Sequence, residues 1–247
     1  MSQKRENLLN GILHILQPEA NKGLRVNVDT ILLADFAKPA KREKILDIGC
    51  AHGAISLILA KRGFNIVGLD IQQHLIEMAT ENAKINELDD KTKFITGDIK
   101  DYKKLWEAQS FDRIVVNPPY YETENSQKSP FEEKAKATQE TNCTLEDVIM
   151  ASKYLLKNKG HLNIIISASR LVELFILLDK YNIAAKVMRS VHPKPNTSAS
   201  VVLVEGMRAA KKGITVFPPL FICGSDGKET FELSSAYTLE GSEKLCL

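Results

Sequence analysis

The residues Asn117-Pro118-Pro119-Tyr120 directly follow an apolar run over 111–116. Proline lacks an N–H and fixes φ, so this turn cannot continue a strand or a helix. The residue before a proline favours extended backbone, so Asn117 should close a β-strand. The turn therefore presents a carboxamide, free carbonyls and an aromatic ring at one point. These groups suit a planar amino group on a nucleobase or an amide, and the alternative is a purely structural turn.

A second group of polar and small residues lies around Asp47-Ile48-Gly49-Cys50-Ala51-His52-Gly53, after the apolar run 44–48. Small residues allow a sharp strand-to-helix turn and the close approach of a ligand. The N-terminus of the following helix favours a carboxylate or a phosphate. Asp70 ends the next apolar run, where a carboxylate can hold a ribose diol. The Gly-x-Gly-x-x-Gly spacing of dinucleotide sites is absent.

The elements that must position these residues alternate between strands and helices. An apolar stripe over Glu6–Gln17 predicts a helix, and a second helix over Asp29–Ala37 has Asn27 or Asp29 as its N-cap. Five strands are expected, at 44–48, 65–70, 92–96, 111–117 and 162–167, with helices after the first, the second and the fourth. Residues 182–190 and 198–205 follow as an antiparallel hairpin.

This alternation predicts an α/β protein with a doubly wound, mostly parallel sheet covered by helices on both faces. Asp98 follows the third strand, so four successive strand ends carry polar groups. Open α/β sheets bind ligands at the carboxyl ends of their strands. We therefore expect the groups at 47–53, Asp70, Asp98 and Asn117 to form one pocket.

The composition restricts the class of protein. The chain has 247 residues, 44% of them hydrophobic, and a net charge of +2, so any nucleic acid must be held by local patches. Its cysteines have no metal-ligand spacing, which predicts free thiols and no metal site: Cys50, Cys143, Cys223 and Cys246. No apolar stretch has the length of a membrane span, and the N-terminus does not have the pattern of a signal peptide. We expect a cytoplasmic protein, and we favour a monomer.

The loop after the first strand resembles the Asp-x-Gly-x-Gly-x-Gly loop of class I methyltransferases, with Ala51 at the middle glycine. The resemblance implies a Rossmann-like, seven-stranded sheet with a C-terminal antiparallel hairpin, and S-adenosylmethionine as cofactor. It implies that the loop residues lie under the methionyl group: Asp47, Gly49, Cys50, Ala51 and Gly53. It also assigns the ribose to Asp70, the two faces of the adenine to Ile71 and Ile99, and the adenine amino group to Asp98.

The same resemblance places Asn117 against the substrate and also among the residues that border the cofactor. An exocyclic amine conjugated with a ring is a poor nucleophile because its lone pair is delocalised. The side-chain oxygen of Asn117 and the carbonyl of Pro118 can accept both N–H bonds, aim the lone pair at the methyl group and stabilise the growing positive charge. Tyr120, beside Tyr121, would stack on a base that has left its helix.

Two further segments resemble bacterial tRNA1(Val) adenine-N6 methyltransferases, which modify the adenosine at position 37, next to the anticodon. One is Gly23–Phe36, and the other runs from the Val201–Gly206 strand to Pro218-Pro219-Leu220. The resemblance covers about residues 7 to 230 and implies tRNA as partner. By it, Asp29 and Thr30 approach the methionyl end of the cofactor, although a plain helix cap is an equal alternative.

The substrate surface is predicted from basic residues, with ordinary solvated side chains as the alternative for each. The candidates are Lys38, Lys41, Arg42 and Lys44, then Arg189, His192 and Lys194, and finally Arg208, Lys211 and Lys212. Phosphate contacts of this kind position an RNA without recognising its sequence. Lysines in the loop 121–142 could cover a flipped base. His52 departs from the small residues usual in the cofactor loop, so its side chain either points outward or crowds the methionyl group; we expect it to be exposed.

Other members of the fold remain alternatives. A glutamine-N5 methyltransferase of release factors uses the same Asn-Pro-Pro-Tyr, but its helical substrate domain has no room in the 46 residues before Asp47. An rRNA guanine-N2 methyltransferase and a non-catalytic RNA-binding module are the others. We expect one methyltransferase domain over residues 1–210, with a short N-terminal helical segment, and a partly ordered extension over 211–247 that forms no separate domain.

Overall fold

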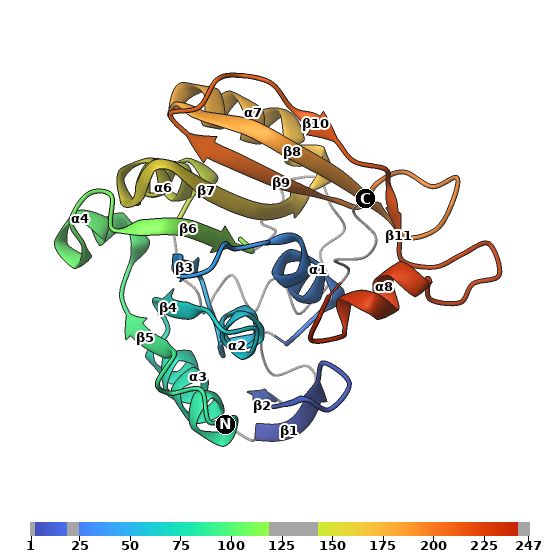
Figure 1. The fold of residues 1–247 in the computed structure, drawn as a ribbon, viewed down its shortest axis with the longest axis horizontal. Coiled ribbons are helices and arrows are strands. Elements are labelled where there is room, and N and C mark those ends of the chain that lie inside the picture. Colours follow the sequence, from blue (N-terminus) through green and yellow to red (C-terminus); the bar gives the residue numbers. More distant parts are fainter. Residues whose placement is uncertain (1–2, 19–24, 119–142, 242–247) are drawn as a thin grey trace.

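The computed structural model describes residues 3–18, 25–118 and 143–241, and Figure 1 shows their arrangement. Its main sheet has nine strands in the order β10-β8-β9-β7-β6-β3-β4-β5, with β11 also paired to β8. Strand β9 is antiparallel to both neighbours, and the other pairs are parallel. The strands are β3 Lys44–Ile48, β4 Asn65–Asp70, β5 Thr92–Thr96, β6 Phe111–Val116, β7 Leu156–Ser167, β8 Ile183–His192, β9 Val201–Arg208, β10 Thr215–Val216 and β11 Leu220–Phe221.

The predicted sheet and edge hairpin are therefore confirmed, and the two-residue strands β10 and β11 extend the seven strands that were expected. From β3 the chain adds β4 and β5 on one side, whereas β6 and β7 are added on the other. The strand order thus reverses between β3 and β6. Such a reversal opens a crevice at the carboxyl ends of the strands, where ligands bind.

Helices cover both faces of the sheet (Figure 1). Helices α1 Val28–Phe36 and α2 Ala54–Lys61 pack in one hydrophobic cluster, and α6 Leu145–Leu155 and α7 Leu171–Lys180 pack in the other. Alternate strand residues enter the two clusters, because side chains alternate between the faces of a sheet. In β6, Val115 belongs to the first cluster, and Ile114 and Val116 to the second. The described residues also form the helices α3 Gln73–Ile85, α4 Tyr102–Leu105 and α8 Phe231–Ala236.

The helix predicted over Glu6–Gln17 is wrong: this segment forms a β-hairpin. Strands β1 Gln3–Leu8 and β2 Leu13–Pro18 pair antiparallel, and the turn has positive φ at Leu9, Asn10 and Gly11. The apolar spacing of this segment suits a helix, but side chains of α3 form hydrogen bonds with its backbone in the extended conformation. Asn82 exchanges two hydrogen bonds with the backbone of Leu16, and Asn86 does the same with His14.

The extension after β9 packs on the domain through residue 241. Strands β10 and β11 pair in parallel with β8, and Leu233 and Ala236 of α8 are buried in the first cluster. Arg62 donates hydrogen bonds to the carbonyls of Thr238 and Leu239. The described part of the extension therefore adds to the sheet and to the core.

A charged network is buried at the amino ends of β6 and β7. Arg113 is only 3% exposed, and it pairs with Glu43 at 2.7 Å and with Glu205 at 3.0 Å. His161 Nδ1 lies 3.1 Å from the second Glu205 oxygen. Burial alone would raise the pKa of Glu205, but the hydrogen bond with His161 and the charges of Arg113 and His161 lower it to about 2.

Because of Glu205, the free energy of unfolding should depend on pH in the acidic range. Because its pKa is depressed in the folded state from 4.5 to about 2, its contribution is complete above pH 4.5 and is lost as the pH falls toward 2. We expect about 2 kcal/mol of the free energy of unfolding to disappear over this window. Chemical denaturation at several pH values measures the free energy of unfolding. Below pH 4.5 this free energy should fall less steeply in Glu205→Gln than in the parent protein, whereas substitution of the exposed Glu107 by Gln should leave the fall unchanged. Equal falls in the parent protein and both variants would contradict this role of Glu205.

Candidate active site

The four strand ends singled out in the sequence lie at one level of the sheet. Ile48 is opposite both Leu69 and Val116, so Gly49, Asp70 and Asn117 follow these strands side by side. Asp70 is in turn paired with Thr96, two residues before Asp98. Neighbouring strands are about 4.8 Å apart, which places Asp70 and Asn117 about 10 Å apart on either side of the loop after β3. The predicted gathering of these residues at one sheet edge is confirmed.

The loop after β3 is held by its own backbone and by β4. The amides of Gly49 and Cys50 both donate to the carbonyl of Leu69. Gly49 has φ +71°, and no atom of the described residues lies within 4 Å of the position that a Cβ would take. Gly53 has φ +89°, and a Cβ there would approach Ala79 and Phe94 to 3.1 Å. Gly49 therefore leaves room for a ligand, while Gly53 is required for packing.

Asp70 fastens this loop to the end of β4. One carboxylate oxygen accepts the Ala51 N–H at 2.9 Å, and the other accepts the Gln72 N–H at 2.9 Å. Burial raises the pKa of Asp70, and the two N–H groups counteract this rise. A carboxylate oxygen has lone pairs for more than one donor. Asp70 can therefore hold the loop and still accept hydrogen bonds from a ligand.

Asp47 is buried beneath the loop with one oxygen unused. Ser56 of α2 donates to its Oδ2 at 2.7 Å, whereas Oδ1 has no hydrogen-bond partner among the described residues. Burial raises the pKa of Asp47 to about 7, the Asp70 charge adds to the rise, and the Ser56 hydrogen bond opposes it. An unpaired buried oxygen is uncommon in folded proteins. It fits a donor supplied from outside the protein.

The residues predicted around the adenine differ in how much surface they offer. Ile71 is 41% exposed beside the buried Asp70, whereas Ile99 is 6% exposed and belongs to the second cluster. Asp98 accepts the Lys100 N–H at 2.9 Å as the cap of a short 3₁₀ helix. The Cys50 thiol lies toward Gly68 in the interior. Ile71 therefore offers far more apolar surface than Ile99, and Cys50 can contribute only its backbone.

The acceptor motif is described in part. Asn117 is half-buried and Pro118 is buried, directly after β6. The predictions made for Tyr120, Tyr121 and the loop to residue 142 lie outside the described residues.

The start of α1 is a helix cap. Asn27 Oδ1 accepts both the backbone N–H and the hydroxyl of Thr30, each at 3.0 Å. Of the two capping residues expected, Asn27 is therefore the one used. Asp29 lies in the first turn of the helix and is half-buried.

The prediction that His52 is exposed is wrong. Its side chain is 3% exposed, and burial lowers its pKa to about 4, with the charge of Arg25 as the second cause. Asn82 of α3 donates to the His52 carbonyl at 2.9 Å. Asn82 also binds the backbone of Leu16 in the β1–β2 hairpin. Because the sequence pattern does not predict this hairpin, it does not predict the burial of His52 either.

The basic residues predicted for RNA are divided between two edges of the sheet. The β8–β9 loop, which holds Lys194, lies at the carboxyl edge of the sheet, as do the four strand ends. Because β9 is antiparallel, Arg208 and the following Lys211 and Lys212 lie at the opposite edge, about 25 Å away along the strand. Lys38, Lys41, Arg42 and Lys44 precede or begin β3 and also lie away from the site.

Two of the predicted contacts are engaged within the protein. Arg189 is 9% exposed, donates to the Pro218 carbonyl and pairs with Glu232. Arg208 donates to the Leu156 carbonyl at 2.6 Å. Their assignment as substrate contacts stays a prediction, and in this structure these side chains hold the extension and the sheet together. Lys212 forms an exposed ion pair with Asp179.

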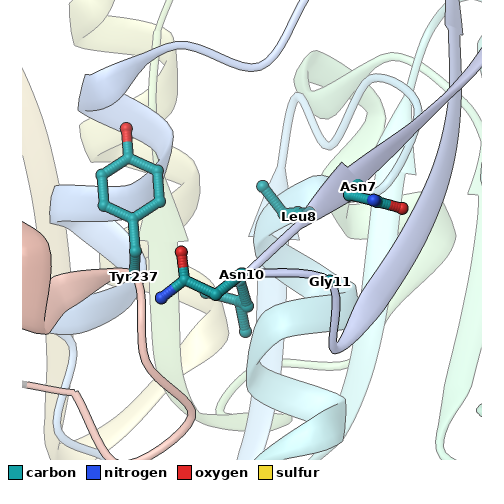
Figure 2. A pocket seen from close by; sticks show the side chains of 6 residues that line it. Asn7, Leu8, Asn10, Gly11 and Tyr237 are labelled. Carbon is teal, nitrogen blue, oxygen red and sulfur yellow. The ribbon is translucent and has the colours of Figure 1, made fainter.

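Two cavities lie away from the four strand ends. One, of about 420 Å³, is formed by the hairpin turn and Tyr237, as Figure 2 shows. The other, of about 570 Å³, borders the Arg113 network between α1 and β8–β9. Within the described ranges, no group of His, Cys, Asp and Glu side chains could hold a metal ion. No helix in that part of the chain is long and apolar enough to cross a membrane.

The strand order, the loop after β3 and the acidic ends of β3 and β4 define a class I methyltransferase fold. The profile of the methyltransferase domain family matches residues 39–195, and the chain belongs to this family. A solved structure of a predicted O-methyltransferase from Agrobacterium tumefaciens superposes with a TM-score of 0.70 at 17% identity, covering 85% of this chain and 97% of that one. This similarity confirms the predicted fold.

The resemblance to tRNA1(Val) adenine-N6 methyltransferases is also confirmed by comparison with known proteins. The tRNA1(Val) (adenine(37)-N6)-methyltransferase of Actinobacillus pleuropneumoniae serotype 5b is 31% identical over 156 residues, which are 61% of this chain and 64% of that protein. The protein of the same name from Bacteroides thetaiotaomicron is 28% identical over 184 residues, or 73% of this chain and 76% of the relative. The match thus spans just under two thirds of the first relative.

Proposed function

We propose that this protein transfers a methyl group from S-adenosylmethionine to the exocyclic N6 of adenosine 37 in tRNA1(Val). The observation that carries the proposal is the placement of Asn117 level with the loop after β3 and with Asp70. An acceptor for an amine and a pocket for a nucleoside cofactor therefore share one edge of the sheet. The relatives named for this reaction supply the choice of adenine and of tRNA.

The residues present fit the cofactor. Among the residues that the structure describes, buried Asp47 Oδ1 has no partner and no atom fills the space above Gly49. Ile71 presents apolar surface next to the Asp70 carboxylate, as an adenosine requires. Asp70 would hold the ribose hydroxyls, the loop 47–53 the methionyl part and Asp98 the adenine amino group. When bound, the cofactor supplies a methyl group on a positively charged sulfur.

Asn117 and Pro118 would activate the target amine. The side-chain oxygen of Asn117 and the carbonyl of Pro118 accept the two N–H bonds, which turns the nitrogen lone pair away from the ring. Positive charge develops on this nitrogen during transfer, and acceptors already in place stabilise it. The proton becomes acidic as the new bond forms, so no strong base is required. Tyr120 would hold the flipped base by stacking.

The reaction can be tested with purified protein, labelled S-adenosylmethionine and tRNA1(Val) transcripts. We expect label in the transcript with adenosine 37, and none when this position is guanosine. Label in both transcripts would overturn the assignment of the nucleotide. Label in a release factor or in rRNA, and none in tRNA, would favour the glutamine or guanine alternatives. No transfer to any acceptor would support a non-catalytic RNA-binding module.

We further propose that the RNA lies across the carboxyl edge of the sheet, in the cytoplasm, and that the enzyme acts as a monomer. Lys194→Ala should then weaken tRNA binding two- to fivefold, because one phosphate contact is lost. The slope of log affinity against log salt concentration should become shallower by about one. Lys212→Ala, at the opposite edge, is the matched control and should bind like the parent protein. Fluorescence anisotropy at several salt concentrations measures both. Equal weakening in the two variants would contradict this orientation of the RNA.

A further inference from the structure

Unpaired buried polar atoms concentrate in the loop after β3. In the described part of the chain, three buried side-chain nitrogen or oxygen atoms have neither a hydrogen-bond nor an ion-pair partner. They belong to two residues at this loop: Oδ1 of Asp47, near the end of β3, and both ring nitrogens of His52. A further buried atom, Nδ1 of His161, lies 3.1 Å from the Glu205 oxygen with which it pairs. Each unpaired group costs about 1–3 kcal/mol, so their concentration in one loop requires an explanation.

The His52 ring is held in this position by its backbone. Asn82 binds the His52 carbonyl and, through Leu16, joins it to the β1–β2 hairpin. The residues on either side, Ala51 and Gly53, have φ values of 49° and 89°. The strand-to-helix turn thus fixes where the side chain enters the interior. Rotation of the ring into solvent would require this turn and its contact with α3 to change.

The unpaired groups are complementary to a free α-amino acid. Asp47 Oδ1 is an acceptor, which suits an ammonium group, and a neutral imidazole has one N–H donor, which suits a carboxylate. His52 lies in the turn that leads into α2, whose N-terminal dipole also favours a carboxylate, and Asp47 lies in the strand before this turn. The charge of Arg25, which is paired with Glu6 at 2.7 Å, also acts on His52. The only part of the proposed cofactor with an ammonium and a carboxylate is its methionyl end.

We propose that His52 donates a hydrogen bond to the methionyl carboxylate of S-adenosylmethionine. This inference rests on the cofactor half of the proposed function. It assigns His52 as a cofactor-specificity residue for the amino-acid end, in a loop position where related loops carry a small residue. Asp47 lies on the ammonium side of the same group. The alternative is that His52 only packs the hairpin against α3, in which case it would affect all ligands of the pocket equally.

The two roles are separated by comparing two ligands. S-Adenosylhomocysteine has the amino-acid end, and 5′-methylthioadenosine has the same nucleoside without it. In isothermal titration calorimetry, His52→Leu should weaken the binding of S-adenosylhomocysteine 10- to 100-fold. This is the effect expected from the loss of a hydrogen bond to a charged group. Its affinity for 5′-methylthioadenosine should remain within twofold of the parent protein. His52→Gln retains a donor and should recover most of the lost affinity.

Thermal unfolding without ligand provides the control for folding. His52→Leu removes an unpaired imidazole from the interior, so it should leave the midpoint unchanged or raise it. If the leucine variant does not fold, His52→Ala, which also lacks the donor, gives the same test through the ratio of its two affinities to those of the parent protein. Equal weakening of both ligands, or weakening of neither, would overturn the role of His52. Failure to methylate tRNA while these ligand ratios behave as expected would refute the substrate assignment alone.

Discussion

Asn117→Ala is expected to reduce methyl transfer by about 10²–10³-fold, the effect of losing one preorganised acceptor in a transition state. The side chain lies at the end of β6, beside the cofactor loop but outside its hydrogen bonds to β4. It would contact the target amine and not the cofactor. The affinity for S-adenosylhomocysteine should therefore stay within about twofold of the parent value. The loss should appear in kcat, because the acceptor acts most strongly as charge develops on nitrogen.

Single-turnover kinetics with labelled cofactor and saturating tRNA would measure this loss. Asn65→Ala is the matched control, since Asn65 is an exposed asparagine at the amino end of β4, on the far side of the sheet. It should retain the activity of the parent protein. Full activity of Asn117→Ala would remove the proposed acceptor role, and a parallel loss of cofactor binding would show that Asn117 belongs to the cofactor pocket instead.

Asp70→Ala is expected to weaken cofactor binding about 100-fold or more. The substitution removes the acceptor for the ribose, and it also leaves the Ala51 and Gln72 amides without their present partner. The loop after β3 would then lose its link to the end of β4. Hydrogen bonds to a charged group contribute about 1.5–3 kcal/mol each, so the loss of even one ribose contact accounts for a large part of this effect.

Calorimetric titration with S-adenosylhomocysteine would measure the effect, with Asp89→Ala, an exposed aspartate after α3, as the control. Asp70→Asn should have an intermediate affinity, because its amide oxygen can replace one of the two acceptors. Unchanged affinity in Asp70→Ala would mean that the cofactor pocket lies elsewhere on the molecule.

The sequence allowed the parallel sheet and the gathering of strand ends to be predicted because these depend on local patterns. Short apolar runs followed by Gly49, Asp70 or Asn117-Pro118 mark where each strand ends, and parallel strands bring their carboxyl ends to one edge. The register that makes these three positions level is a consequence of pairing β4 and β6 with the same residue of β3.

Other features depended on contacts between distant segments. The apolar spacing over Glu6–Gln17 fits a helix, and only Asn82 and Asn86 of α3 show why extended backbone is preferred. The burial of His52 follows from the same packing. The basic residues after β9 resemble those before it in sequence, yet one antiparallel strand places Lys194 and Lys212 at opposite edges. Local patterns contain no information about such distances.

The most direct test of the central claim is to map N6-methyladenosine in tRNA from cells that lack this protein. Nucleoside mass spectrometry of isolated tRNA1(Val) should show unmodified adenosine at position 37, and the parent gene should restore the methyl group. The gene encoding Asn117→Ala should not restore it, although the variant still binds S-adenosylhomocysteine. Full N6-methylation at position 37 in the strain without the protein, or in the strain with Asn117→Ala alone, would contradict the account.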